Sequence, residues 1–337
     1  MGKFTMQFHV TAACDQNCKH CYMHDSETFE SEVNNQLSTE QCIQIIDDFA
    51  SLMKRWELQG KINFTGGDPL LRKDLFDLLE HTKKAGLDFG ILGNPYHVTE
   101  EVAARLKGLG INQYQVSIDG TGPTHDGFRR KGSYNDTMRA IRIINEAGIR
   151  SAVLFTLSKS NKDELLDVID AVAEASVSIF DFARLVPMGS GKSLSGDMLS
   201  PDEFRHMLLL VLEKYGQLAK SGCKTYFGRK DPLWALLQKE LGTLQPSSDG
   251  CKICDGCTIG MSAFSVLADG TVYACRRLPI KIGKVPEQNL LDIFIRSEKL
   301  NDMRKYERME NCGECELLRV CRGCRAVCFG VSGDYFG

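Results

Sequence analysis

The chain has 337 residues, of which 43% are hydrophobic, so it can bury a sizeable core, which excludes disordered, collagen-like and low-complexity classes. Its 41 Lys and Arg residues nearly balance 44 Asp and Glu residues, which excludes the strongly basic surface of a nucleic-acid-binding protein. No apolar run approaches the roughly 20 residues that a membrane-spanning helix needs, and the start of the chain contains no signal-peptide core. We therefore predict a cytoplasmic protein that binds neither nucleic acid nor membranes, built as one large domain or as a core domain with an appendage.

Short β-prone runs alternate with amphipathic segments through the first 184 residues. The predicted strands are residues 4–11, 61–65, 88–92, 113–118, 151–156 and 178–183. The predicted helices between them are residues 39–55, 74–85, 99–107, 134–147 and 162–175. Ser38 and Gln41 are predicted to form a capping box at the start of the first helix. Six strands separated by helices imply right-handed crossovers and a parallel sheet. We predict an α/β fold, a partial (β/α)6 TIM barrel, with ligands bound at the carboxyl ends of its strands.

The rest of the chain changes in character. Residues 187–199 are rich in Gly and Ser and are predicted to be a loop, followed by helices at 201–220 and 231–241. The runs 264–267 and 271–274 flank Asp269-Gly270, which predicts a small β-hairpin. A short helix is predicted at 290–297. We predict three units: the partial barrel at 1–190, a helical linker region at 191–250 and a Cys-rich domain at 251–337.

Fourteen cysteines are too many for packing alone in an enzyme-sized chain, and in a reducing compartment such clusters are more often metal ligands than disulfides. Cys14, Cys18 and Cys21 directly follow the first predicted strand. Three thiolates hold three corners of a [4Fe-4S] cube and leave the fourth iron open to another ligand. The alternative is a Cys3His zinc site that uses His20 or His24, but residues as close as Cys18, His20 and Cys21 make poor tetrahedral geometry.

The segment Cys14-Asp-Gln-Asn-Cys18-Lys-His-Cys21-Tyr22 resembles the CxxxCxxC-aromatic signature of the radical S-adenosylmethionine (radical SAM) superfamily. Thr65-Gly-Gly-Asp-Pro69 resembles the GGEP motif of that family, with Asp in place of the usual Glu. Ser117-Ile-Asp-Gly120, followed by His125-Asp126 and Arg129, resembles its SxDG…HDxxR stretch. By this resemblance the cofactor-binding residues are Tyr22, Gly66, Gly67, Asp68, Asn94, Ser117, Asp119, Arg129 and Leu185. The alternatives for two of them are ordinary: Asn94 as a turn residue and Leu185 as part of the core.

The resemblance assigns a role to each motif. The glycines turn around the methionyl amine of S-adenosylmethionine and Asp68 helps to hold it. Ser117 and Asp119 face the ribose or the carboxylate, and Arg129 or Arg130 pairs with the carboxylate. It also implies a reaction, in which the amine and carboxylate chelate the open iron and one electron cleaves the sulfonium C–S bond. The resulting 5′-deoxyadenosyl radical removes a hydrogen atom from an unactivated carbon of the substrate.

Nine more cysteines lie between residues 251 and 328. A zinc ribbon that uses Cys254 and Cys257 with Cys312 and Cys315 is one alternative, and the cysteine count does not decide against it. The pattern from Cys257 through Asp269–Cys275 to the final CxxC groups closely resembles the SPASM domain of radical SAM maturases, which carries two auxiliary [4Fe-4S] clusters. By that resemblance one cluster takes Cys251, Cys257, Cys275 and Cys324, and the other takes Cys312, Cys315, Cys321 and Cys328. Cys251 and Cys254 compete for one place. Three clusters and S-adenosylmethionine are the implied cofactors.

Three substrate classes compete within this resemblance: a ribosomally made peptide, the side chain of a tetrapyrrole, and a sulfatase Cys or Ser that becomes formylglycine. In sulfatase-maturing members an Asp follows the cysteine equivalent to Cys275, whereas this chain has Arg276 and Arg277, which disfavours the third class. We predict maturation of a small Cys-containing peptide or protein, with a flavodoxin- or ferredoxin-type reductant. Many peptide maturases carry a peptide-recognition module before their first metal ligand, whereas in this chain the first ligand is already residue 14. Peptide maturation is therefore expected to require a separate leader-binding protein, a leaderless peptide or another substrate. An iron–sulfur electron carrier is the alternative from another class, but a carrier has no use for the cofactor motifs.

Overall fold

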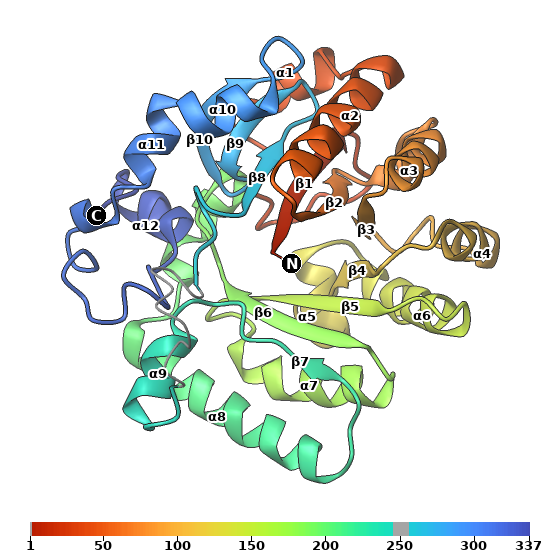
Figure 1. The fold of residues 1–337 in the computed structure, drawn as a ribbon. Helices are drawn as coiled ribbons and strands as arrows, with labels where there is room; N and C mark the ends of the chain where they lie inside the picture. The colour runs from red at the N-terminus through yellow and green to blue at the C-terminus, as the bar shows by residue number, and fades with distance from the viewer. Residues whose placement is uncertain (1, 245–255) are drawn as a thin grey trace.

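The computed structural model describes residues 2–244 and 256–337. In this part of the chain, ten strands form one sheet in the order β10-β9-β8-β1-β2-β3-β4-β5-β6-β7. Strands β1 (Lys3–Thr11), β2 (Gln59–Gly66), β3 (Asp88–Leu92), β4 (Tyr114–Ser117), β5 (Ser151–Leu157) and β6 (Ile179–Arg184) run parallel, each beside the next. They match the six predicted strands. The predicted partial (β/α)6 barrel is confirmed (Figure 1).

Helices cover the outer face of this sheet (Figure 1). They are α2 (Thr39–Arg55), α3 (Leu75–Lys84), α4 (Glu100–Leu109), α6 (Ser133–Glu146), α7 (Leu165–Glu174) and α8 (Pro201–Lys220). The predicted capping box is present at α2, where Ser38 Oγ accepts from the Gln41 backbone N–H at 3.3 Å and Gln41 Oε1 accepts from the Ser38 N–H at 2.9 Å. The six strands and the start of α2 therefore follow from local sequence signals.

The alternation of side chains along β1 separates the two faces of the sheet. Phe4, Met6 and Phe8 are at most 1% exposed and belong to the core under the helices. The intervening polar residues belong to the opposite face, where Thr5 and Gln7 line one interior cavity and His9 lines another. The inner face of the barrel is thus polar and hollow, which leaves room for ligands.

The C-terminal hairpin extends the barrel sheet. Strand β8 (Ala263–Val266) pairs in parallel with β1, and β9 (Thr271–Cys275) pairs antiparallel with β8 and with β10 (Leu278–Lys284). The hairpin was predicted, whereas β10 and the short strand β7 (Tyr226–Phe227) beside β6 were not. Pairing with β1 brings the residues after β9 to the same barrel that carries the first cysteines. Residues far apart in the sequence therefore share one site.

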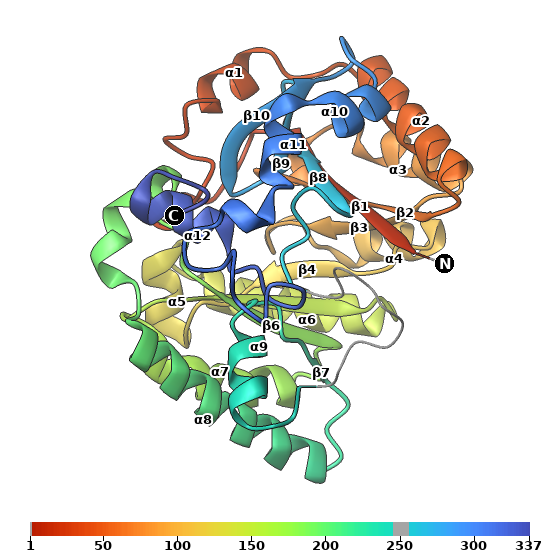
Figure 2. The ribbon, with the colours of Figure 1, turned by 60° about the vertical axis from the view of Figure 1, so that its left-hand side comes forward.

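Shorter helices complete the fold: α1 (Phe29–Asn34), α5 (Gly122–Phe128), α9 (Trp234–Glu240), α10 (Leu290–Arg296), α11 (Glu298–Met303) and α12 (Arg325–Ser332). In Figure 2, α12 lies against the edge of the barrel near the hairpin strands and α1 lies above it. The predicted loop at 187–199 is wrong over most of its length, because Gly189–Asp197 forms a 3-10 helix. Its backbone is held by the cysteine loop, since the Ser190 N–H donates to the His24 carbonyl at 2.8 Å. Among the described residues, none of the helices combines the length and hydropathy that a membrane crossing requires.

Candidate active site

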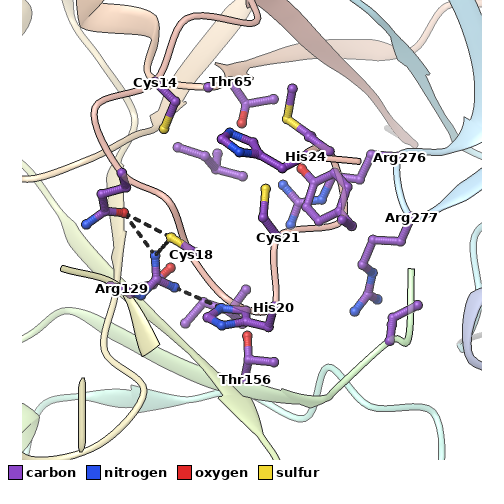
Figure 3. A pocket seen from close by; sticks show the side chains of 18 of the residues that line it. Cys14, Cys18, His20, Cys21, His24, Thr65, Arg129, Thr156, Arg276 and Arg277 are labelled. Atoms are coloured by element: carbon purple, nitrogen blue, oxygen red, sulfur yellow. Dashed lines mark hydrogen bonds between the residues drawn. The ribbon is translucent and has the colours of Figure 1, made fainter. Parts of the chain in front are cut away.

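The three N-terminal cysteines line one cavity at the carboxyl end of the barrel strands. Cys14, Cys18 and Cys21 lie on the loop after β1, and their sulfur atoms point into the space shown in Figure 3. The cavity has a volume of about 170 Å³. Seven of the nine predicted cofactor-binding residues line it as well: Tyr22, Gly66, Gly67, Asn94, Ser117, Arg129 and Leu185. Asp68 and Asp119 are fully buried behind its wall.

The chemistry of the three thiols fits a metal centre. Burial raises the pKa of all three, and that of Cys18 reaches about 12. The charge of a Cys21 thiolate would raise the pKa of Cys14 and Cys18 further. Three neighbouring buried thiols do not ionise together without a cation to offset their charge. Iron supplies that charge, so the donor set fits the cluster that the spacing predicts.

The glycine pair at the end of β2 holds the cysteine loop through its backbone. The Gly67 N–H donates to the Thr11 carbonyl at 2.9 Å, and the Asp68 N–H donates to the Ala13 carbonyl at 2.8 Å. A Cβ atom on Gly67 would lie 2.0 Å from the Ala13 oxygen, and Gly66 has a φ of +132°. Both positions therefore require glycine, and their contact with the loop is independent of any cofactor.

Asp68 keeps one acceptor atom unused. Its Oδ1 accepts from the backbone N–H groups of Leu70 at 3.3 Å and Asn94 at 3.4 Å. Its Oδ2 has no hydrogen-bond partner within the described part of the chain. Burial raises the pKa of this carboxyl to about 7. An orphaned buried oxygen beside the glycine pair fits a site whose ligand carries a protic cationic group.

Asn94 and Tyr22 lie at opposite ends of the cysteine set. Asn94 Nδ2 donates to Asp15 Oδ1 at 2.7 Å and lies 3.4 Å from Cys14 Sγ. The Tyr22 ring lies under the guanidinium of Arg276, which is 5.5 Å from the ring centroid. Asn94 therefore contacts a cysteine directly, in addition to lying at the end of a strand.

Asp119 and Arg129 form a buried ion pair beside Cys18. Arg129 Nε donates to Asp119 Oδ2 at 2.6 Å, and Arg129 Nη1 lies 3.6 Å from Cys18 Sγ. Asp119 Oδ1 accepts from the Thr156 backbone N–H at 2.8 Å, and its Oδ2 is 3.4 Å from His20 Nε2. Both Asp119 oxygens are thus engaged by protein atoms. The predicted contact of Asp119 with the cofactor stays a prediction; the observed contact orients Arg129.

Several further residues line this cavity that the sequence motifs did not indicate: Gln16, His20, Thr156, Arg184, Arg276 and Arg277. Gln16 and His20 lie between the cysteines in the sequence, so their closeness to the metal-ligand motif was a usable signal. Arg276 and Arg277 come from the turn after β9 and reach the cavity only because the hairpin joins the barrel sheet (Figure 3). Two arginines thus contribute positive charge at the cavity wall.

The C-terminal cysteines gather in two groups. Cys257, Cys275 and Cys324 line a separate interior cavity of the barrel. Burial raises the pKa of Cys257 to about 11, and the charges of Cys324 and Cys275 act in the same direction. The second group is Cys312, Cys315, Cys321 and Cys328, in which Cys312 and Cys315 act electrostatically on Cys321, and Cys312 on Cys328. Cys251 and Cys254 lie outside the described residues.

The surroundings of Arg325 indicate whether the C-terminal cysteines suit a metal centre. The Arg325 side chain is 1% exposed, and Nη1 and Nη2 have no hydrogen-bond partner in the described segments. It lies close enough to Cys257, Cys312 and Cys328 to lower the pKa of each thiol, against the larger opposite effect of burial. The guanidinium lies over the rings of Tyr306 and Phe336, but a buried guanidinium without a hydrogen-bond acceptor is also stabilised by negative charge on the thiols beside it. Thiolate-bound iron–sulfur clusters supply it.

Comparisons with known proteins identify the class. The model of the radical SAM superfamily matches residues 8–172, and that of the SPASM iron–sulfur cluster-binding domain matches residues 257–316. An Fe-coproporphyrin III synthase of Methanosarcina barkeri is 32% identical over 94% of this chain and 81% of its own length. The chain therefore belongs to the radical SAM superfamily and is an enzyme. Within the superfamily it carries a SPASM domain, so S-adenosylmethionine and iron–sulfur clusters are its cofactors.

Other relatives differ in what they are named for. The AdoMet-dependent heme synthase of Methanosarcina barkeri is 29% identical over 97% of this chain and 92% of its own length. Mycofactocin maturase MftC of Mycolicibacterium smegmatis is 27% identical over 96% and 78%. Among solved structures, Streptococcus suis SuiB with S-adenosylmethionine has a TM-score of 0.75 at 15% identity, covering 96% of this chain and 73% of SuiB. AnSMEcpe with AdoMet has 0.75 at 18%, covering 98% and 93%. At such identities the structural likeness concerns the fold alone.

Proposed function

We propose that this enzyme abstracts a hydrogen atom from a peptide side chain and so matures a ribosomally made peptide, for example by a thioether or other cross-link. The proposal depends on one observation: three cysteines, the glycine pair Gly66–Gly67 and Arg129 line one cavity, and a second cavity lies directly beside it. The first cavity suits the cofactors and the second leaves room for a substrate. Peptide maturases such as MftC and sporulation killing factor maturation protein SkfB of Bacillus subtilis are among the relatives.

The residues around the first cavity have separable roles in this proposal. Cys14, Cys18 and Cys21 hold a cluster, which with S-adenosylmethionine supplies the one-electron cleavage that yields a 5′-deoxyadenosyl radical. The backbone at Gly66 and Gly67 leaves space for the methionyl group, and Asp68 Oδ2 accepts from its amine. Arg129 pairs with its carboxylate, and Asp119 acts as a positioning residue that holds Arg129. Asn94, Ser117, Leu185 and Tyr22 bound the nucleoside and exclude water.

In this proposal the C-terminal cysteines hold two auxiliary [4Fe-4S] clusters, which gives three clusters per chain. Cys257, Cys275 and Cys324, with Cys251 as the fourth ligand, hold one. Cys312, Cys315, Cys321 and Cys328 hold the other. This assignment is supported by the electrostatics, because the cysteines that raise the pKa of each thiol belong to the same group as that thiol. The division of the chain into 1–190, 191–250 and 251–337 is proposed on the same grounds, and the two family models fall within the first and third units.

Tetrapyrrole chemistry is the second candidate. A heme synthase and an Fe-coproporphyrin III synthase align over nearly the whole chain. Arg276 and Arg277 face both cavities and would suit the carboxylate of a tetrapyrrole side chain. A flavodoxin- or ferredoxin-type reductant and a separate leader-binding protein stay predictions for the peptide case.

A product assay separates the two candidates. The reconstituted holoenzyme is incubated under dithionite with S-adenosylmethionine and either Cys-containing peptides encoded near the gene or Fe-coproporphyrin III. Mass spectrometry of the peptide and absorbance of the tetrapyrrole report modification, and chromatography reports 5′-deoxyadenosine. We expect a peptide product that loses hydrogen relative to the precursor. Conversion of the tetrapyrrole alone would replace the first proposal by the second, and the absence of 5′-deoxyadenosine in every reaction would contradict both.

A further inference from the structure

A second cavity adjoins the proposed cofactor cavity. It has a volume of about 450 Å³ and is walled by β1, α1, the 3-10 helix at Gly189–Asp197, the hairpin strands and α12. Tyr22, Met23, Arg276 and Arg277 line both cavities, so only the thickness of one side chain separates them. A substrate in the second cavity would therefore lie beside the cofactor.

Two buried polar side chains of this cavity have atoms without a hydrogen-bond partner among the described residues. The His9 side chain is 0% exposed, and neither of its ring nitrogens has a hydrogen-bond partner in residues 2–244 or 256–337. The Glu32 side chain is 2% exposed, and within the same ranges its Oε2 is also unpartnered. Its Oε1 accepts from the Thr28 hydroxyl at 3.1 Å, which fixes the carboxyl in place. Three orphaned buried atoms at the wall of one cavity are a strong indication of a ligand, because leaving such atoms unpaired costs free energy.

The distance between the two groups indicates what the ligand offers. His9 Nδ1 and Glu32 Oε2 are 4.0 Å apart, which is too far for a direct hydrogen bond. One atom placed about 3 Å from each bridges them without moving either side chain. The ligand atom therefore donates a hydrogen bond to the carboxylate and accepts one from the imidazole, as the oxygen of a hydroxyl or the sulfur of a thiol does.

The electrostatics of the pair favour proton transfer to Glu32. Burial raises the pKa of Glu32 to about 7, against the Thr28 hydroxyl and the Ala268 N–H, which lower it, and the Asp269 charge raises it further. Burial, with the charge of Arg276, lowers the pKa of His9 to about 3, so the imidazole is neutral. A carboxylate poised near neutral pH is suited to act as a general base. A neutral imidazole in the tautomer with hydrogen on Nδ1 donates to the same ligand atom, and Arg276 stabilises negative charge nearby.

We propose that the second cavity binds the substrate side chain that becomes ionised, a thiol or a hydroxyl, and that Glu32 is the base that takes its proton while His9 donates to the anion left behind. The S–H or O–H bond breaks, the electron pair stays on the substrate atom, and the proton passes to Glu32 Oε2. The negative charge moves from the carboxylate to the substrate, and no oxidant or reductant is consumed. This proposal rests on the proposed function, since it takes the substrate to be a peptide held beside the cofactor cavity.

The test compares Glu32→Gln, which keeps the shape but accepts no proton, with Glu30→Gln, an exposed residue of the same helix whose side chain is not in the cavity wall. The probes are synthetic peptides with a single cysteine and the same peptides with serine, which distinguish a thiol from a hydroxyl. We expect Glu32→Gln to lower product formation by about 100-fold or more while 5′-deoxyadenosine formation and iron content stay close to wild type. Glu32→Asp should restore part of the product rate, and Glu30→Gln should match wild type.

The pH profile gives a readout that a merely structural role would not move. Besides His9, the ionisable groups that face Glu32 or the cavity are Tyr22, Glu27, Lys192, Asp269, Tyr273, Arg276 and Arg277. Because the base acts when deprotonated, the wild-type product rate should rise about tenfold per pH unit below 7 and level off above it. Glu32→Gln should lose this limb. Infrared difference spectra of substrate-free wild type minus Glu32→Gln should show a protonated-carboxyl band that disappears as pH rises through about 7.

Unchanged product rates and an unchanged pH profile in Glu32→Gln would overturn the proposal, as would an infrared spectrum in which Glu32 is already ionised at pH 5. Loss of 5′-deoxyadenosine in Glu32→Gln would also overturn it, because the residue would then act on the cofactor site. Failure of the proposed function looks different: wild type itself would form no 5′-deoxyadenosine, or would convert only a tetrapyrrole. If wild type forms no 5′-deoxyadenosine, the infrared titration still tests whether Glu32 is protonated below pH 7. If wild type converts only a tetrapyrrole, the proposal for Glu32 is contradicted.

Discussion

Replacing Gly67 by alanine tests whether the glycine pair positions the cysteine loop. The new Cβ would lie 2.0 Å from the Ala13 carbonyl oxygen and 2.7 Å from that of Ala12, whereas ordinary contact begins at 3.4 Å. The Ala13 oxygen must therefore recede by about 1.4 Å, the difference between 3.4 and 2.0 Å. This atom also accepts the Asp68 N–H, and it directly precedes Cys14. The substitution thus displaces the proposed metal ligand Cys14 and weakens the hydrogen bond that holds the cysteine loop to Asp68.

A displacement of about 1 Å at a reacting centre typically costs about 100-fold in rate. We expect Gly67→Ala to lower 5′-deoxyadenosine formation by at least that factor and to weaken S-adenosylmethionine binding, while the iron of the C-terminal cysteines is retained. The assays are chromatography of 5′-deoxyadenosine, equilibrium binding of the cofactor and iron analysis. Gly216→Ala in α8 is the matched control, because its Cβ would meet no atom within 4 Å, and it should stabilise the helix by about 0.5–1 kcal/mol. Wild-type cofactor affinity and rate in Gly67→Ala would refute the reasoning.

Four more variants test the remaining parts of the site. Replacing Cys14, Cys18 and Cys21 by Ala should abolish 5′-deoxyadenosine formation, and cleavage of S-adenosylmethionine by this variant would contradict the assignment of the cluster. Replacing Cys312 and Cys315 should preserve 5′-deoxyadenosine formation while the modified product is lost, provided that circular dichroism shows a folded chain. Asp119→Asn leaves Arg129 without its buried partner, so we expect the free energy of unfolding to fall by about 3 kcal/mol or more and cofactor affinity to fall with it. The half-buried Asp136, 3.9 Å from Arg139, should cost less than about 1 kcal/mol when changed to Asn, and equal losses in denaturant titrations would argue against a special role for Asp119. Arg325→Leu should lower the iron bound by the C-terminal cysteines, measured against the exposed Arg296→Leu; full iron content in both would contradict the proposed charge compensation.

Local sequence was sufficient for the parts of this protein that depend on near neighbours along the chain. The alternation of β-prone runs with amphipathic segments and the capping box at Ser38 predicted the six βα units, because side-chain periodicity and backbone hydrogen bonding are local properties. The spacing of Cys14, Cys18 and Cys21 predicted a metal site, because three ligands within one short loop need no distant partner. The motif at residues 65–69 could be placed at the end of its strand for the same reason.

Only the tertiary structure decided which distant residues meet. The parallel pairing of β8 with β1 brings Arg276 and Arg277 to the cofactor cavity, and local signals do not specify a pairing between strands more than 250 residues apart. The same holds for Asp119, whose carboxylate is turned to Arg129 and Thr156, and for Glu32, which lies opposite His9. A glutamate on a short helix and a histidine within a strand look ordinary in the sequence. Their burial, the loss of hydration that shifts their protonation, and the cavity between them arise only when the chain closes around its own interior.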